Sequence, residues 1–154
     1  IVLMKKLLML AVAGLFTLSS TIAGAATKDG DRILGEYKAV KDGRQTTGRI
    51  SKIGENRYKA QVVGVRDKNH SDVVVGTDIN NPDPTKRDIP SNQIVLIESV
   101  SYNGEKDVWD DGQIYDPTKG DVYRVVLDFK NDKTLRVRGY LGPFSKSLYW
   151  EKIN

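Results

Sequence analysis

The chain of 154 residues contains no cysteine. This absence excludes disulfide bonds, thiol catalysis and thiolate metal sites. It also excludes a lipid anchor attached to a cysteine behind an export signal. A domain of this size without disulfides must therefore be stabilised by its hydrophobic core.

Histidine is almost as scarce, because His70 is the only one in the chain. It stands next to Ser71 and Asp72, but the members of a catalytic triad are brought together by the fold and rarely lie side by side in sequence. Phosphate-binding loops, nucleophile elbows and zinc-protease motifs are also missing. We interpret His70 as a loop residue. We assign no catalytic residue and expect no cofactor. The sequence favours a non-enzymatic role but leaves an enzymatic one open.

Charge of a single sign is also lacking. The formal net charge is +4, and acidic and basic residues are interspersed. This balance argues against nucleic acid as a partner.

Long apolar runs are confined to the start of the chain. Two lysines after Met4 precede the apolar run Leu7–Leu18, and small residues follow at Ala23–Ala26. This order is typical of a secretory signal, and the run is too short to span a bilayer comfortably. We therefore predict cleavage between Ala25 and Ala26.

The predicted cleavage divides the chain into a signal peptide with a short upstream extension, 1–25, and one domain, 26–154. Removal of the two lysines lowers the net charge by two. The mature protein is expected to be soluble, without a stable membrane anchor, and located in the periplasm or secreted from a bacterial cell.

The mature chain alternates short strand patterns with turn residues. In 134–141, for example, Leu135 and Val137 alternate with Arg136 and Arg138, a period of two that gives one buried and one wet face. Strands are expected at 33–40, 45–53, 57–65, 93–102, 106–116, 121–129, 134–141 and 146–153. Between them, 66–91 is interpreted as a long loop with at most one short strand at 73–76.

Eight short strands without a long helix predict an all-β fold, either a single antiparallel barrel or a sandwich. A closed eight-stranded barrel removes exposed strand edges and encloses packed side chains or one small ligand.

The densest stretch of the chain is 109–123, Trp-Asp-Asp-Gly-Gln-Ile-Tyr-Asp-Pro-Thr-Lys-Gly-Asp-Val-Tyr. Asp116, Pro117 and Gly120 are residues that tight turns prefer, since they supply a hydrogen-bond acceptor, a preset φ and a positive φ. We interpret them as structural turn residues.

Other acids in this region allow a sharper hypothesis. Asp107, Asp110, Asp111 and Asp116 could offer oxygen ligands to calcium, but their spacing does not match a calcium-binding loop, and no metal site is predicted. Gly112 instead suggests that 110–112 forms a turn or a β-bulge.

Aromatic and arginine side chains supply the candidates for binding. Most aromatics in strands pack in the core or in cross-strand pairs, and a minority can line a pocket. Arg136 and Arg138 are either solvated charges or an anion-recognising rim. The candidate ligand-binding residues are Trp109, Tyr115, Tyr123, Arg138, Tyr140 and Trp150.

The chain resembles the DUF2147 family of bacterial secreted proteins of unknown function. The stretch 109–123 is close to the family pattern W-x-x-G-x-I-Y-D-P-x-x-G-x-x-Y, and Thr-Leu-Arg-Val-Arg-Gly-Tyr-Leu-Gly and Ser-Leu-Tyr-Trp-Glu-Lys-Ile follow it. Asn-Asn-Pro-Asp-Pro at 80–84 also fits, whereas Tyr37 stands where the family usually has tryptophan. The resemblance implies a small lipocalin-like β-barrel and no particular reaction.

Three functions remain open, two of them non-enzymatic and one enzymatic. The favoured one is a non-enzymatic barrel protein of the envelope that binds a small apolar or amphipathic ligand, or an envelope partner. The alternatives are a solid-core barrel used for protein–protein contacts and, ranked last, an envelope hydrolase using aspartates within 107–116 together with Arg138.

Overall fold

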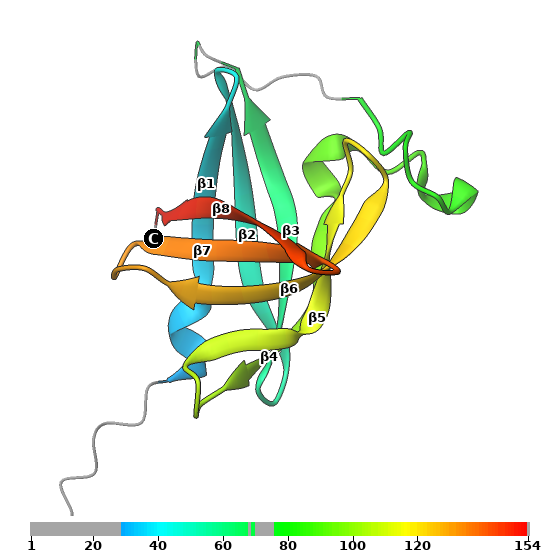
Figure 1. Ribbon diagram of the computed structural model, residues 1–154. Coiled ribbons are helices and arrows are strands. Elements are labelled where there is room, and N and C mark those ends of the chain that lie inside the picture. Colours follow the sequence, from blue (N-terminus) through cyan, green and yellow to red (C-terminus); the bar gives the residue numbers. More distant parts are fainter. Residues whose placement is uncertain (1–28, 68, 70–75, 154) are drawn as a thin grey trace, which may run out of the picture.

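Eight antiparallel strands, each hydrogen-bonded to the next, close into a barrel (Figure 1). The computed structural model describes residues 29–67, 69 and 76–153. The strands are β1 Gly35–Lys41, β2 Arg44–Gly54, β3 Arg57–Arg66, β4 Val95–Asn103, β5 Val108–Asp116, β6 Asp121–Phe129, β7 Thr134–Leu141 and β8 Phe144–Lys152. The expected all-β fold is confirmed as a barrel and not a sandwich, and each strand ends within two residues of its predicted bounds.

Tight turns join most neighbouring strands. Asp42 and Gly43 between β1 and β2 both have positive φ, 52° and 74°, as the two-residue hairpin turn of type I′ requires. Asp116 and Gly120 bound the β5–β6 turn, where Gly120 has φ 72° and its N–H donates to the Asp116 carbonyl. The Asp116 carboxylate also accepts from the backbone N–H of Thr118 at 2.9 Å.

A bulge in β5 decides between the two interpretations of 110–112. Trp109 pairs with Leu127 and Gly112 with Val125, so β5 holds one extra residue there. A Cβ on Gly112 would lie 2.0 Å from the Ser99 carbonyl oxygen. The glycine is therefore needed because β4 approaches closely. The stretch 110–112 is a bulge within one strand and not a turn between two strands.

The short helix η1, Gly30–Ile33, lies against one end of the barrel (Figure 1). The Trp109 indole N–H donates to the Gly30 carbonyl at 3.2 Å, and the Arg32 guanidinium lies 4.7 Å from the centre of the Trp109 ring. Arg32 also forms an ion pair with Asp107. The guanidinium of Arg32, stacked on the ring of Trp109, therefore closes the end of the barrel next to η1.

The interior is filled by the inward-facing side chains of the strands. The fully buried ones with the largest volume are Trp109, Tyr37, Tyr58, Ile33, Ile97, Leu127, Leu135, Val125 and Val137.

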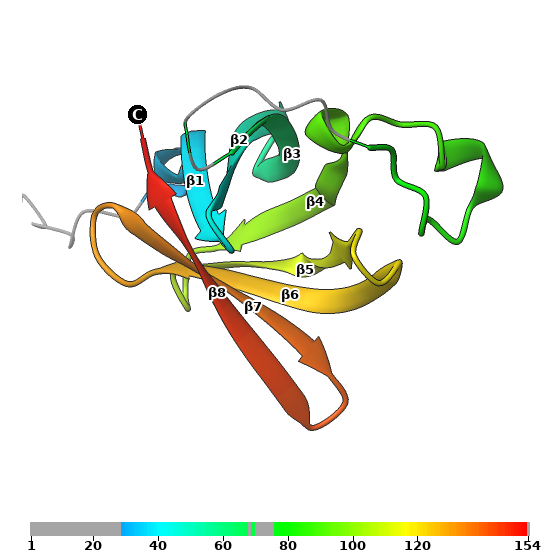
Figure 2. The ribbon, with the colours of Figure 1, turned by 90° about the horizontal axis from the view of Figure 1, so that it is seen from above.

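Barrel closure is weakest between β1 and β8, which are joined through only two residue pairs. Figure 2 shows the β7–β8 hairpin diverging from β1 and β2. Leu148 pairs with the buried Val137 but is 49% exposed, and Leu141 and Phe144 at the hairpin tip are more exposed still. The inner face of this hairpin is therefore partly uncovered.

The long connection between β3 and β4 is irregular where it is described. It contains η2, Pro84–Lys86, and η3, Ser91–Gln93, and a single bridge joins Thr77 to Pro90. Most of the short strand expected at 73–76, the residues 70–72 around the lone histidine and the predicted signal peptide 1–25 lie outside the described residues. Among the residues that are described, no helix is long and apolar enough to cross a membrane.

Candidate functional site

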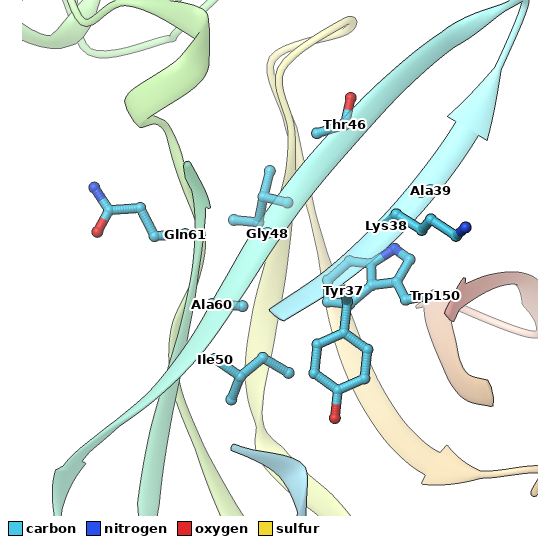
Figure 3. Close-up of a pocket in the computed structure, with 10 residues that line it drawn as sticks. Tyr37, Lys38, Ala39, Thr46, Gly48, Ile50, Ala60, Gln61 and Trp150 are labelled. Carbon is cyan, nitrogen blue, oxygen red and sulfur yellow. The ribbon is translucent and has the colours of Figure 1, made fainter. Parts of the chain in front are cut away.

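The barrel interior leaves little free space. A cavity of about 40 Å³ lies among Tyr37, Gly48, Ile50, Ala60 and Trp150 (Figure 3). Sites for drug-sized ligands occupy roughly 300–1,000 Å³, and about 10–15 Å³ of such space accommodates one water. The inner cavity can therefore hold a few waters but not an amphipathic ligand.

A much larger groove, of about 840 Å³, lies where β4 and β5 diverge. The ladder between these strands joins Ser101–Asn103 to Val108–Asp110, and the groove extends beyond it along Val95–Ser99 and Asp111–Tyr115. Residues of the segment 78–94 form its other wall. We call this space the outer-face groove.

The groove lies outside the barrel core. Gln113 and Tyr115 line it and alternate with Ile114, whose side chain packs against the core. Arg124 likewise alternates with the buried Val125. Since successive side chains of a strand point to opposite faces, the groove-lining residues of β5 and β6 point away from the interior.

Asp78 anchors the segment 78–94 to the barrel. Its side chain is buried, and its carboxylate accepts from the Tyr115 hydroxyl at 2.7 Å and from the Asn81 amide at 2.8 Å. Its backbone N–H donates to the Ile89 carbonyl at 2.8 Å. Burial, followed by the hydrogen bond to Asp78, raises the pKa of the Tyr115 hydroxyl well above its ordinary value. The hydrogen bond from the Tyr115 hydroxyl to the Asp78 carboxylate therefore holds the segment 78–94 against β5.

A second attachment joins the same segment to the β5–β6 turn. The Asn80 amide donates to the carbonyls of Pro117 and Thr118 at 3.2 and 3.1 Å. A Cβ on Gly120 would lie 2.1 Å from the Asn80 carbonyl oxygen. The turn residues predicted from sequence thus also form the surface on which the groove wall sits.

Comparison with known proteins agrees with this architecture. A family model described as "Uncharacterized protein conserved in bacteria (DUF2147)" matches residues 35–152. The chain belongs to the DUF2147 family. The resemblance inferred from 109–123 and 80–84 is therefore confirmed, and the structure shows that these two stretches meet beside the groove. Among curated protein sequences, none matches this DUF2147 protein.

A solved structure has a similar fold. It is described as "Protein HP1028 from the human pathogen Helicobacter pylori belongs to the lipocalin family". The two chains are 17% identical, the match covers 79% of the DUF2147 chain and 83% of the other, and the TM-score is 0.64. At this identity the likeness establishes the fold, which is a lipocalin-like barrel.

Charges of both signs line the groove of the DUF2147 protein. Arg57 and Arg124 stand on β3 and β6, and Glu98 and Asp111 stand on β4 and β5. Within the described part of the chain, none of these four side chains takes part in an ion pair. Apolar side chains line the groove near the segment 78–94, so the surface is amphipathic. They are Pro82, Ile89, Ile94, Val95, Leu96 and Val122.

The six candidate ligand-binding residues do not form one site. Trp109 and Trp150 are buried core residues, and Tyr123 pairs with the core-packed Ile114. Only Tyr115 lines the groove, and its hydroxyl is committed to Asp78.

The remaining two candidates lie on the outer face of β7. Arg138 donates to the Tyr140 hydroxyl at 3.1 Å, and the ring of Tyr140 lies under the guanidinium of Arg124. Arg136, the other half of the predicted anion-recognising rim, forms a two-pronged hydrogen-bonded ion pair with Asp128. The structure therefore associates Arg138 with Arg124, a residue that the sequence did not single out.

The aspartates of 107–116 are spread from the residue before β5 to its last residue. Asp107 pairs with Arg32 at the end of the barrel closed by η1, whereas Asp116 bends the turn at the other end of the strand. Within the described residues, no group of three or more His, Asp or Glu side chains is placed to hold a metal ion. Arg138 also forms no ion pair with Asp110, Asp111 or Asp116 in this part of the structure. The aspartates of 107–116 therefore do not gather into one cluster in the described structure.

Sequence reasoning missed the groove wall and its buried anchor. Asp78 stands in a polar stretch without strand or helix periodicity, so nothing in the local pattern marks it as buried. The one available signal was the Asn-Asn-Pro-Asp-Pro stretch at 80–84, which the resemblance had already singled out beside the turn motif.

Proposed function

We propose that this DUF2147 protein is a non-enzymatic binding protein that holds a small amphipathic ligand in its outer-face groove. The observation that carries this proposal is the contrast between a groove of about 840 Å³ and an inner cavity of about 40 Å³. Of these two spaces, the groove is the one with the size of a small-molecule site, and its lining combines apolar and charged side chains.

We further propose that the protein works in the bacterial envelope, in the periplasm or outside the cell. The support is the order of the first residues, with two lysines, the apolar run Leu7–Leu18 and the small residues Ala23–Ala26. An envelope protein encounters amphipathic molecules released from membranes, which suits a groove of mixed polarity.

A second candidate function is favoured by the filled interior. A barrel whose core is packed with aromatic and branched side chains can serve as a rigid scaffold, and its outer face then contacts another protein. Leu141 and Phe144, which pair with each other at the tip of the β7–β8 hairpin, are exposed apolar side chains available for such a contact.

Native mass spectrometry of protein purified from its own envelope tests the ligand proposal. Val122 lines the groove and is 47% exposed, so Val122→Trp is expected to fill the groove with a larger side chain. Val40 is 67% exposed on β1 and does not line the groove, which makes Val40→Trp a matched control.

A small molecule should accompany the unchanged protein and the Val40→Trp variant and be absent from Val122→Trp. If the unchanged protein carries no bound species, or if Val122→Trp retains it fully, the groove is not the ligand site and the scaffold function is favoured.

A further inference from the structure

Two arginines on the outer face of the barrel are organised around one tyrosine. The guanidinium of Arg124 on β6 lies 4.2 Å from the centre of the Tyr140 ring on β7. The Nη1 atom of Arg138, two residues before Tyr140, donates to its hydroxyl at 3.1 Å. Stacking and hydrogen bonding thus hold two guanidinium groups beside the same ring.

Neither arginine is neutralised within the described residues. Their neighbour Arg136 provides the contrast, since its Nε and Nη2 atoms donate to the two carboxylate oxygens of Asp128 at 2.8 and 2.6 Å. Asp110 and Asp111, in the bulge opposite Val126, form no ion pair with Arg124 or Arg138 in the described structure, and Asp128 on β6 is paired with Arg136. Two like charges held together without a carboxylate attract an anion.

The cluster is continuous with the groove. Arg124 lines the groove, and Val122, two residues earlier on the same face of β6, belongs to its apolar part. A molecule lying along β6 would therefore meet an apolar surface first and a cationic one next.

We propose that Arg124, Arg138 and Tyr140 form an anion-recognition site at the rim of the groove. The site takes the phosphate or carboxylate group of an amphipathic ligand whose apolar part lies against Val122. This inference rests on the proposed function of the groove. Arginine suits the role because its planar fork matches both anions.

Other groove charges restrict the ligand further. Glu98 and Asp111 also line the groove, and like charges brought against them raise the free energy of binding. A single anionic group held by Arg124 and Arg138 meets less of this repulsion than several anionic groups along the groove would.

Calorimetric titration of the purified protein with three probes tests the site. Decyl phosphate carries the anion and an apolar tail, 1-decanol carries the same tail without charge, and inorganic phosphate carries the anion alone. The variants are Arg124→Gln and Arg138→Gln, and Arg136→Gln is the matched control that removes one cation of the same face outside the site.

Decyl phosphate should bind more tightly than 1-decanol, and each of the two site variants should weaken its binding by about tenfold or more, the loss of one charge-assisted hydrogen bond. Arg136→Gln should leave decyl phosphate binding unchanged, and 1-decanol should be insensitive to all three variants.

Equal binding of decyl phosphate and 1-decanol, or an equal loss in Arg136→Gln, would overturn the anion site while the groove function stands. Inorganic phosphate binding as tightly as decyl phosphate would overturn the assignment to an amphipathic ligand. If neither ten-carbon probe binds, the proposed function of the groove fails together with the site.

Discussion

At the scale of single residues, the role of each aspartate is set by the groups that its carboxylate meets. The partly buried Asp116 accepts from the backbone and hydroxyl of Thr118 and shapes a turn. Asp107 pairs with Arg32 beside an aromatic cluster. Asp78 is buried and accepts from Tyr115 and Asn81, because a buried carboxylate is tolerated only when donors satisfy it.

Tyr115→Phe tests the anchor at Asp78. The substitution removes a hydroxyl donor and leaves the buried carboxylate one hydrogen bond short, which should lower the free energy of unfolding by about 1–3 kcal/mol. Urea denaturation measures this loss, and limited proteolysis should show earlier cleavage within 78–94. Unchanged stability and unchanged cleavage would mean that the wall is held by other contacts.

The same pair predicts a pH dependence. The folded-state pKa of Tyr115 is raised above its ordinary value of 10.0, so its contribution to stability is complete below about pH 10 and is lost as the pH rises through the folded-state pKa. The difference in unfolding free energy between the unchanged protein and Tyr115→Phe should accordingly be constant at neutral pH and narrow at strongly alkaline pH. A difference that widens on alkaline titration would contradict the assigned contact.

At the scale of elements, irregularities in the strands position the groove. The bulge at 110–112 places Asp111 at φ 59° and brings β4 against Gly112, after which β4 and β5 diverge. The β5–β6 turn then supports the segment 78–94 through Asn80. A regular β4–β5 ladder would leave no groove, because paired strands lie only about 4.8 Å apart.

Gly112→Ala should be strongly destabilising. The added Cβ would meet the Ser99 carbonyl oxygen, so the two strands must separate at the cost of their ladder, and we expect a loss of about 3 kcal/mol in unfolding free energy. Gly76→Ala is the matched control, because nothing lies within 4 Å of its added Cβ. Thermal denaturation of both variants tests this expectation. Similar melting temperatures would show that β4 can move away from residue 112 at little cost in stability.

At the scale of the whole molecule, the barrel is closed but unevenly so. Most neighbouring strands share long ladders, with eight pairs between β7 and β8, whereas β1 and β8 share two. The end near η1 is closed by Arg32 on Trp109, and the β7–β8 hairpin diverges at the other (Figure 2). Opening motions should therefore begin at the β1–β8 junction, where few hydrogen bonds must break.

Amide hydrogen exchange measures this directly. The amides of 144–149 that face away from β7 should exchange much faster than those of β6, which is paired on both sides. Slow exchange throughout 144–149 would contradict this expectation. It would show that the side of β8 facing away from β7 is covered in solution, for example by a second molecule.

Local chemistry determined most of the architecture. Alternation of apolar and polar residues, together with Asp-Gly and Gly-Pro turns, places every strand within two residues of its observed bounds, because side-chain period and turn conformation are local properties. The turn roles of Asp116, Pro117 and Gly120 follow from the same reasoning.

The groove was decided only by the tertiary structure. Its walls come from β4, β5, β6 and the segment 78–94, and its anchor joins Asp78 to Tyr115 across 37 positions of the chain. The pairing of Arg124 with Tyr140 likewise depends on strand register between β6 and β7. The burial of Asp78 and the contact between Arg124 and Tyr140 depend on residues that are distant in the sequence. The periodicity of one segment therefore cannot predict them.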